Sequence, residues 1–114
     1  MKNPFAGIGD LGKMMTAARE MQGKVDEFQK TLETLTVVGE SGAGLVRVTA
    51  NAKGELQALD IDPSIFVPSE KQVVEDLILA AIRDAQDKAM ARAQAEGQRL
   101  AGDMGLPPGM KLPF

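Results

Sequence analysis

The side chains that could do chemistry in this chain form a short set. The 114 residues include no Cys, His, Tyr or Trp, so the sequence lacks a thiolate nucleophile, an imidazole base and the commonest zinc ligands. Carboxylates, Lys, Arg, Ser and Thr remain as candidate catalytic groups. We therefore expect a protein that is not an enzyme, with no catalytic residue, no metal site, no cofactor and no small-molecule substrate.

Two patterns resemble familiar sites but fit structural roles better. The segment Gly39–Gly44 is rich in glycine, yet it lacks the Gly-Lys-Ser/Thr ending of a phosphate-binding loop, and strand-forming residues follow it. Asp60 and Asp62 are spaced like ligands of a divalent cation, but Ile61 belongs to a strand pattern and Pro63 suits a helix start. We expect a hairpin loop in the first case and a helix cap in the second.

Positive charge lies toward the two ends of the sequence, although the formal net charge is −3. Residues 55–87 hold eight acidic side chains and only two basic ones, whereas basic side chains outnumber acidic ones in residues 1–24 and 88–102. Cations on two separate segments can neutralise the phosphates of a DNA duplex with little sequence readout. The plainer interpretation is ordinary solubilising charge. The candidate DNA contacts are Lys13, Arg19, Lys24, Lys88, Arg92 and Arg99.

A heptad pattern predicts the first element that would carry these cations. Apolar residues recur at alternating spacings of three and four from position 11 to position 35, which is typical of a helix with one narrow apolar seam. We expect a helix over 11–35, with Asp10 as its N-cap and a flexible start over 1–10. The seam would pack against another helix of the chain or against a second copy. Its candidate dimer positions are Leu11, Met14, Ala18, Met21, Val25 and Phe28.

The pattern over residues 36–61 predicts three strands in an antiparallel meander. Leu45–Ala50 alternates in the manner of a half-buried strand. The glycine-rich loop before it and a turn signal at 51–54 after it would separate the strands. Leu56 is out of phase with Leu59, which favours a β-bulge in the third strand.

A second long helix is expected over 69–102, where Ser69 starts a capping box and Gly102 stops the helix. Its apolar side chains are large in the first half and mostly Ala in the second, so the first half can pack on the sheet. Residues 103–114 are apolar and rich in proline, which indicates an extended tail. The chain is thus expected to be one α+β domain over 1–114.

This order leaves apolar surface without a partner inside one chain. A single helical layer is a thin cover for a three-stranded sheet, and the seam and the tail add further apolar surface. A twofold homodimer would cover all of it, so we expect the chain to bind a second copy of itself. No stretch approaches the ~20 apolar residues of a membrane span. Residues 1–12 lack the apolar run of a secretory signal, so we expect a soluble cytoplasmic protein with no membrane partner.

Five motifs stand in a distinctive order along the chain. They are the Met-rich opening Leu11–Met21, the glycine-rich Gly39–Val46, Ile61–Ser64, the helical Glu75–Leu77 with Ala80, Ala81, Asp84 and Ala85, and the proline-rich Leu106–Phe114. In this order they resemble the YbaB/EbfC family of bacterial nucleoid-associated proteins. The resemblance implies an intertwined homodimer with a sheet-based body and protruding helical arms. It also implies double-stranded DNA binding through those arms with limited sequence preference, location in the nucleoid, and effects on DNA conformation and gene expression.

A second function class stays open from the residues alone. A non-catalytic adaptor or chaperone-like dimer could use the apolar tail or the Met-rich seam to bind another protein. Salt-sensitive binding to a duplex would favour the DNA-binding protein. A nuclease-insensitive pull-down that is lost on deletion of residues 105–114 would favour the adaptor.

Overall fold

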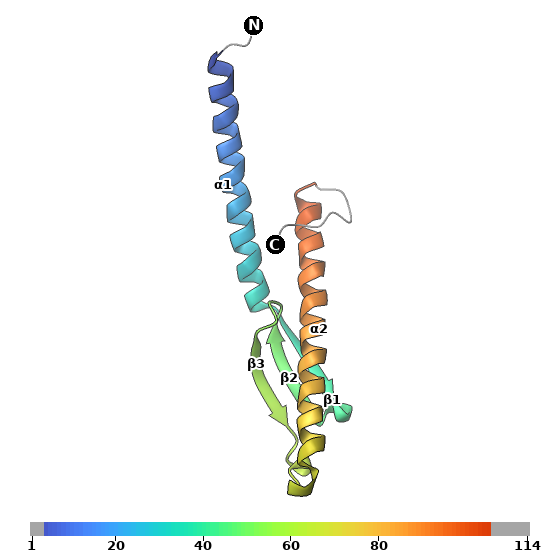
Figure 1. Cartoon of the computed structure of the whole chain (residues 1–114). Helices are drawn as coiled ribbons and strands as arrows, with labels where there is room; N and C mark the ends of the chain where they lie inside the picture. The colour runs from blue at the N-terminus through green and yellow to red at the C-terminus, as the bar shows by residue number, and fades with distance from the viewer. Residues whose placement is uncertain (1–3, 106–114) are drawn as a thin grey trace.

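A computed structural model describes the chain from residue 4 to residue 105, with side chains from residue 10 onward. The elements run in the order α1 (Pro4–Thr34), β1 (Thr36–Ser41), β2 (Val46–Asn51), β3 (Leu56–Ile61) and α2 (Lys71–Asp103), as Figure 1 shows. This order confirms the predicted α+β chain of helix, three-stranded antiparallel sheet and helix. The molecule measures 83 × 22 × 18 Å, and both helices extend beyond the sheet at the same end.

The first helix is longer than its heptad pattern predicts. It begins at Pro4, so residues 4–10 are helical rather than a flexible start, and Asp10 lies inside the helix rather than capping it. Proline suits a first helical turn because its φ is already helical and its missing N–H would have no partner there. Gly7 and Gly9 each weaken the helix by about 1 kcal/mol relative to Ala, but they do not end it.

The sheet is a meander in the order β1-β2-β3, with both pairs antiparallel. The register of β2 and β3 shifts beside Ala50, which pairs with Leu56 while its neighbour Thr49 pairs with Ala58. Gln57 is therefore the extra residue of a bulge, as the phase of Leu56 predicts.

The glycine-rich segment connects β1 to β2 as a hairpin loop. Gly42, Ala43 and Gly44 form a short 3-10 turn with φ values of 59°, 56° and 89°. Glycine takes this left-handed region without steric cost, so two glycines at these positions favour the turn. The segment is structural, as expected.

Small residues allow α2 to lie close on β1 and β2. Val46 and Val48 of β2 are fully buried and cluster with Ala81 and Ala85 of α2. Gly39 of β1 marks the closest approach, because a Cβ there would lie 2.6 Å from the Cα of Ala85 and closer still to backbone atoms of Ala85 and Ala81. The sheet and α2 therefore fit together only while position 39 has no side chain.

Side chains and backbone of α2 also cover the free edge of β1. The backbone N–H of Glu40 donates to Oδ2 of Asp84 at 2.9 Å, and the hydroxyl of Ser41 donates to the carbonyl oxygen of Leu77 at 2.5 Å. The bond from Glu40 satisfies a backbone N–H that an edge strand would otherwise leave open to another strand, and the bond from Ser41 ties the strand to α2.

The helix caps differ in part from the sequence-based expectation. Asp62 is the predicted cap of a short turn, and its Oδ1 accepts from the backbone N–H of Ser64 at 2.8 Å. Ser69 is not the cap of α2, because Pro68 already begins a 3-10 turn and Ser69 lies inside that turn. Gly102 does not stop α2 either. The helix ends at Asp103, and Gly105 follows with a left-handed φ of 74°.

The tail predicted over residues 103–114 therefore begins inside α2, because Asp103 is the last helical residue. Residues 106–114 lie outside the described part of the chain.

The second half of α1 is held by contacts within the chain. Phe28 and Leu32 are buried with Ala52, and Ala93 and Leu100 of α2 pack against this cluster. The heptad seam therefore meets another helix of the same chain at Phe28, which is the expected alternative in which the seam packs within the chain. Toward the N-terminus α1 diverges from α2 and continues beyond its end (Figure 1).

Candidate nucleic-acid interface

The fold brings the two basic segments to one end of the molecule. α1 runs toward the sheet and α2 runs away from it, so residues 10–24 of α1 and 88–103 of α2 lie at the same end (Figure 1). We call these two segments the helical end. The acidic segment 55–87 contributes β3, the two short turns and the first half of α2, and we call it the sheet end. Charge is thus separated along the length of the molecule.

The cations of α1 are exposed and unpaired. Lys13, Arg19 and Lys24 are all exposed, and none makes an ion pair with a described residue. Lys13 and Lys24 are eleven residues apart, about three helical turns, and share one flank of α1, whereas Arg19 lies on another flank. These side chains can reach phosphates from more than one side of the arm.

Lys88 has a structural role in addition to its charge. Its Nζ lies 2.9 Å from Oδ2 of Asp84 and donates to the backbone carbonyl oxygen of Val38 at 3.1 Å. The N–H of Glu40 and then the Lys88 ammonium hold the pKa of Asp84 below its ordinary value. Lys88 is therefore bound to the sheet, and of the three predicted α2 cations it is the least available to a ligand.

Arg92 and Arg99 lie on the face of α2 that Lys88 begins, at spacings of four and seven residues. Their side chains are 50% and 75% exposed. Both contact the carboxylate of Glu96, at 3.6 Å from Arg92 and 3.9 Å from Arg99. The prediction from sequence counted Glu96 in the charge balance but did not identify it as the ion-pair partner of both arginines, although it lies four residues after Arg92 and three before Arg99.

The N-terminal part of the seam is open in the chain. Leu11, Met14 and Met21 are 56%, 67% and 42% exposed, and Ala18 is exposed beside them. Val25 is half-buried, which marks the transition to the packed part of the seam. The exposed stretch is free to meet another surface.

β3 carries a second open apolar surface, which fits the expectation that one helical layer covers the sheet only in part. Leu59 pairs with Val48 and Leu56 with Ala50, so both leucines face the side of the sheet on which α2 lies. They are nonetheless 51% and 48% exposed, because α2 covers β1 and β2 and leaves β3 open. Periodicity assigns a residue to a face but does not tell how far a helix extends across that face.

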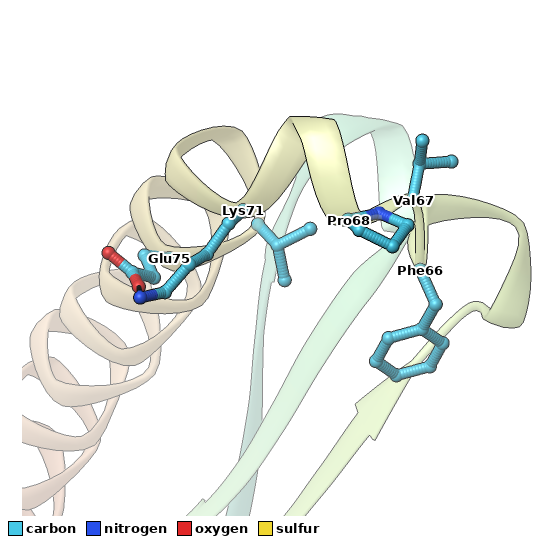
Figure 2. Close-up of a pocket in the computed structure, with 6 residues that line it drawn as sticks. Phe66, Val67, Pro68, Lys71 and Glu75 are labelled. Atoms are coloured by element: carbon cyan, nitrogen blue, oxygen red, sulfur yellow. Dashed lines mark ion pairs between the residues drawn. The ribbon is translucent and has the colours of Figure 1, made fainter.

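An apolar pocket lies at the sheet end (Figure 2). It is lined by Phe66, Val67, Pro68, Lys71, Val74 and Glu75. Phe66 is 61% exposed, and Lys71 and Glu75 pair with each other at 3.6 Å. The two charged side chains of the pocket pair with each other, and the other lining side chains are apolar. The pocket therefore offers apolar contact area rather than groups for acid–base chemistry.

The described residues hold neither a metal-ion cluster nor a membrane-spanning helix. Between residues 4 and 105 no three His, Cys, Asp or Glu side chains gather in a way that could hold a metal ion. Over the same residues neither helix is long and apolar enough to cross a membrane.

Comparison with known proteins gives a consistent result. The profile of the YbaB/EbfC DNA-binding family matches residues 7–104. The nucleoid-associated protein Atu0095 of Agrobacterium fabrum is 46% identical over 105 residues, which cover 92% of this chain and 98% of that protein. The nucleoid-associated protein amb4104 of Paramagnetospirillum magneticum is 49% identical with the same coverage of both chains.

The fold also has a counterpart among solved structures. The crystal structure of the uncharacterized protein HP0035 from Helicobacter pylori aligns with a TM-score of 0.58 and 23% identity. The alignment covers 77% of this chain and 98% of that one. It supports the arrangement of two long helices on a three-stranded sheet.

Proposed function

Because this chain belongs to the YbaB/EbfC DNA-binding family, we propose that it is a nucleoid-associated protein that binds double-stranded DNA with low sequence specificity. The binding unit is a homodimer, and its helical ends are the arms that contact the duplex. By holding DNA between two arms it alters the conformation of the duplex and thereby influences gene expression.

The observation that carries this proposal is the separation of charge along the molecule. Arg92 and Arg99 of α2 and Lys13, Arg19 and Lys24 of α1 lie at the helical end, while residues 55–87 of the sheet end hold eight acidic side chains against two basic ones. A duplex would be attracted to one end of the molecule and repelled by the other. The overall charge of −3 is compatible with binding, because basic side chains outnumber acidic ones by six to four in residues 10–24 and 88–103.

Low specificity follows from the kind of side chains on the arms. Lys and Arg on exposed helix faces bind phosphate oxygens, which are the same for every sequence. Stacking on unpaired bases needs exposed aromatic rings, and Phe28, the aromatic residue of α1 among residues 10–34, is buried. Duplex DNA is therefore the favoured ligand over single strands.

Dimerisation is supported by the apolar surfaces that one chain leaves open. Leu56 and Leu59 of β3 and the seam residues Leu11, Met14 and Met21 are each more than 40% exposed. A second copy related by a twofold axis could cover these surfaces, which would double the number of cationic arms.

Charge reversal on one arm tests the proposal. The variant Arg92→Glu/Arg99→Glu should bind any duplex at least about tenfold more weakly than the wild type, because each reversal replaces a phosphate contact by repulsion. Fluorescence anisotropy with two unrelated duplexes measures this. Arg83→Glu, an exposed arginine of α2 at the sheet end, is the matched control and should bind as the wild type does. Equal binding by all three proteins would contradict the proposal.

A protein-binding adaptor is the second candidate, favoured by the exposed apolar pocket around Phe66. Capture of one protein partner that persists after nuclease treatment, together with absent duplex binding, would support it.

A further inference from the structure

Glu96 connects the two exposed arginines of α2 in one ion-pair cluster. Its Oε1 lies 3.6 Å from Nη2 of Arg92, and its Oε2 lies 3.9 Å from Nη1 of Arg99. The two arginines thus contact different oxygens of the Glu96 carboxylate. The three residues are one helical turn apart, so the cluster runs along a single face of α2.

The three side chains differ sharply in exposure. Glu96 is 15% exposed, whereas Arg92 and Arg99 are 50% and 75% exposed. Glu96 is flanked on α2 by Ala93 and Leu100, which pack against the cluster of Phe28 and Leu32. The carboxylate is therefore partly withdrawn from water at the edge of the α1–α2 contact, where its charge is less screened than on an open helix face.

We propose that Glu96 is a built-in counterion that weakens DNA binding by competing with phosphate for Arg92 and Arg99. This inference rests on the proposed function and deepens it. A carboxylate and a phosphodiester bind the same N–H fork of a guanidinium group, so Glu96 occupies the donors that a phosphate would use. The duplex gains these two contacts only by displacing the carboxylate or by lying close to it.

The geometry of the cluster allows that exchange. Both ion pairs are longer than the ~2.8 Å of a tight charge-assisted hydrogen bond, so the carboxylate does not hold either arginine firmly. Loose pairs between partly exposed side chains add little to the stability of the fold. Replacing the carboxylate by the isosteric amide should therefore leave α2 folded and free both arginines.

The variant Glu96→Gln tests the inference. It should bind a duplex about tenfold more tightly than the wild type at low salt, and its log affinity should fall more steeply with log salt, because more phosphate contacts form. Fluorescence anisotropy across a salt series gives both quantities. Glu75→Gln removes the same charge from another ion pair, that with Lys71 at the sheet end, and should bind as the wild type does.

A variant without the two arginines tests whether the gain in DNA affinity depends on them. In Arg92→Ala/Arg99→Ala, the additional change Glu96→Gln should alter affinity by less than about twofold. A wild type that binds in a salt-sensitive manner while Glu96→Gln binds equally or more weakly would overturn the inference alone. A gain that persists without the arginines would also overturn it. If neither the wild type nor Glu96→Gln binds duplex, the proposed function fails and the inference fails with it.

Discussion

At the scale of single residues, Gly39 determines how closely α2 can lie on the sheet. The missing side chain lets the backbone of α2 at Ala81 and Ala85 approach β1. Ser41 and Glu40, the next residues of the strand, then reach Leu77 and Asp84. One glycine thus sets the contact that the neighbouring hydrogen bonds depend on.

The variant Gly39→Ala should destabilise the protein by about 2–4 kcal/mol, because the added methyl group would overlap backbone atoms that cannot move independently of α2. Chemical denaturation measures the change in the free energy of unfolding. Gly23→Ala in α1 is the matched control, since a Cβ there meets nothing within 4 Å. It should raise stability by up to about 1 kcal/mol through helix propensity. A Gly39→Ala protein as stable as the wild type would contradict this account of the packing.

At the scale of elements, β3 is the strand that the chain leaves partly covered. It pairs with β2 along its length apart from the bulge at Gln57, yet its leucines on the side of α2 remain in water because α2 lies over the other two strands. Exposed leucines on one face of a strand are typical of a surface that binds another protein surface. In the proposed homodimer this surface faces the second copy.

The variant Leu59→Glu should convert the homodimer to a monomer, because a charge would have to be buried at the interface. Sedimentation at micromolar concentration distinguishes the 12.1 kDa chain from a species of twice that mass. Ala58→Glu, on the opposite face of the same strand, is the control and should remain a dimer. A wild type that sediments as a monomer would refute the dimer itself. If Leu59→Glu remains a dimer, the dimer interface does not include this face of β3.

The elements were predictable where the signal is local. The alternation in β2, the glycines of its hairpin and the phase of Leu56 determine strands, turn and bulge through contacts between near neighbours. The start of α1 was missed because helix continuation through Gly7 and Gly9 depends on small energies. The start of α2 was missed because Pro68 begins a turn one residue before the predicted cap.

The sequence could propose candidate contacts but not show how available they are. Charge counting proposed six cations as candidate DNA contacts. It could not find that Lys88 binds a carbonyl group 50 residues away in the sequence, because this contact depends on tertiary packing. The spacing of Arg92, Glu96 and Arg99 was readable, whereas the low exposure of Glu96 depends on how α1 lies against α2.

At the scale of the whole molecule, the antiparallel arrangement of the two helices brings both basic segments to one end. In the sequence the basic segments are separated by the acidic one, and the total charge is negative. In space the fold returns α2 beside α1, so both basic segments reach the helical end while the strongly acidic segment 55–87 stays at the sheet end (Figure 1). An acidic protein can in this way present a cationic surface to a polyanion.

The central claim is that the helical end binds duplex DNA through charge, and the salt dependence of wild-type affinity tests it most directly. With four or more phosphates contacted per dimer, the affinity should fall about a hundredfold between roughly 50 and 200 mM salt. Two duplexes of unrelated sequence should give the same slope within error. Absence of binding at the lower salt concentration, or an affinity that does not change with salt, would contradict the account.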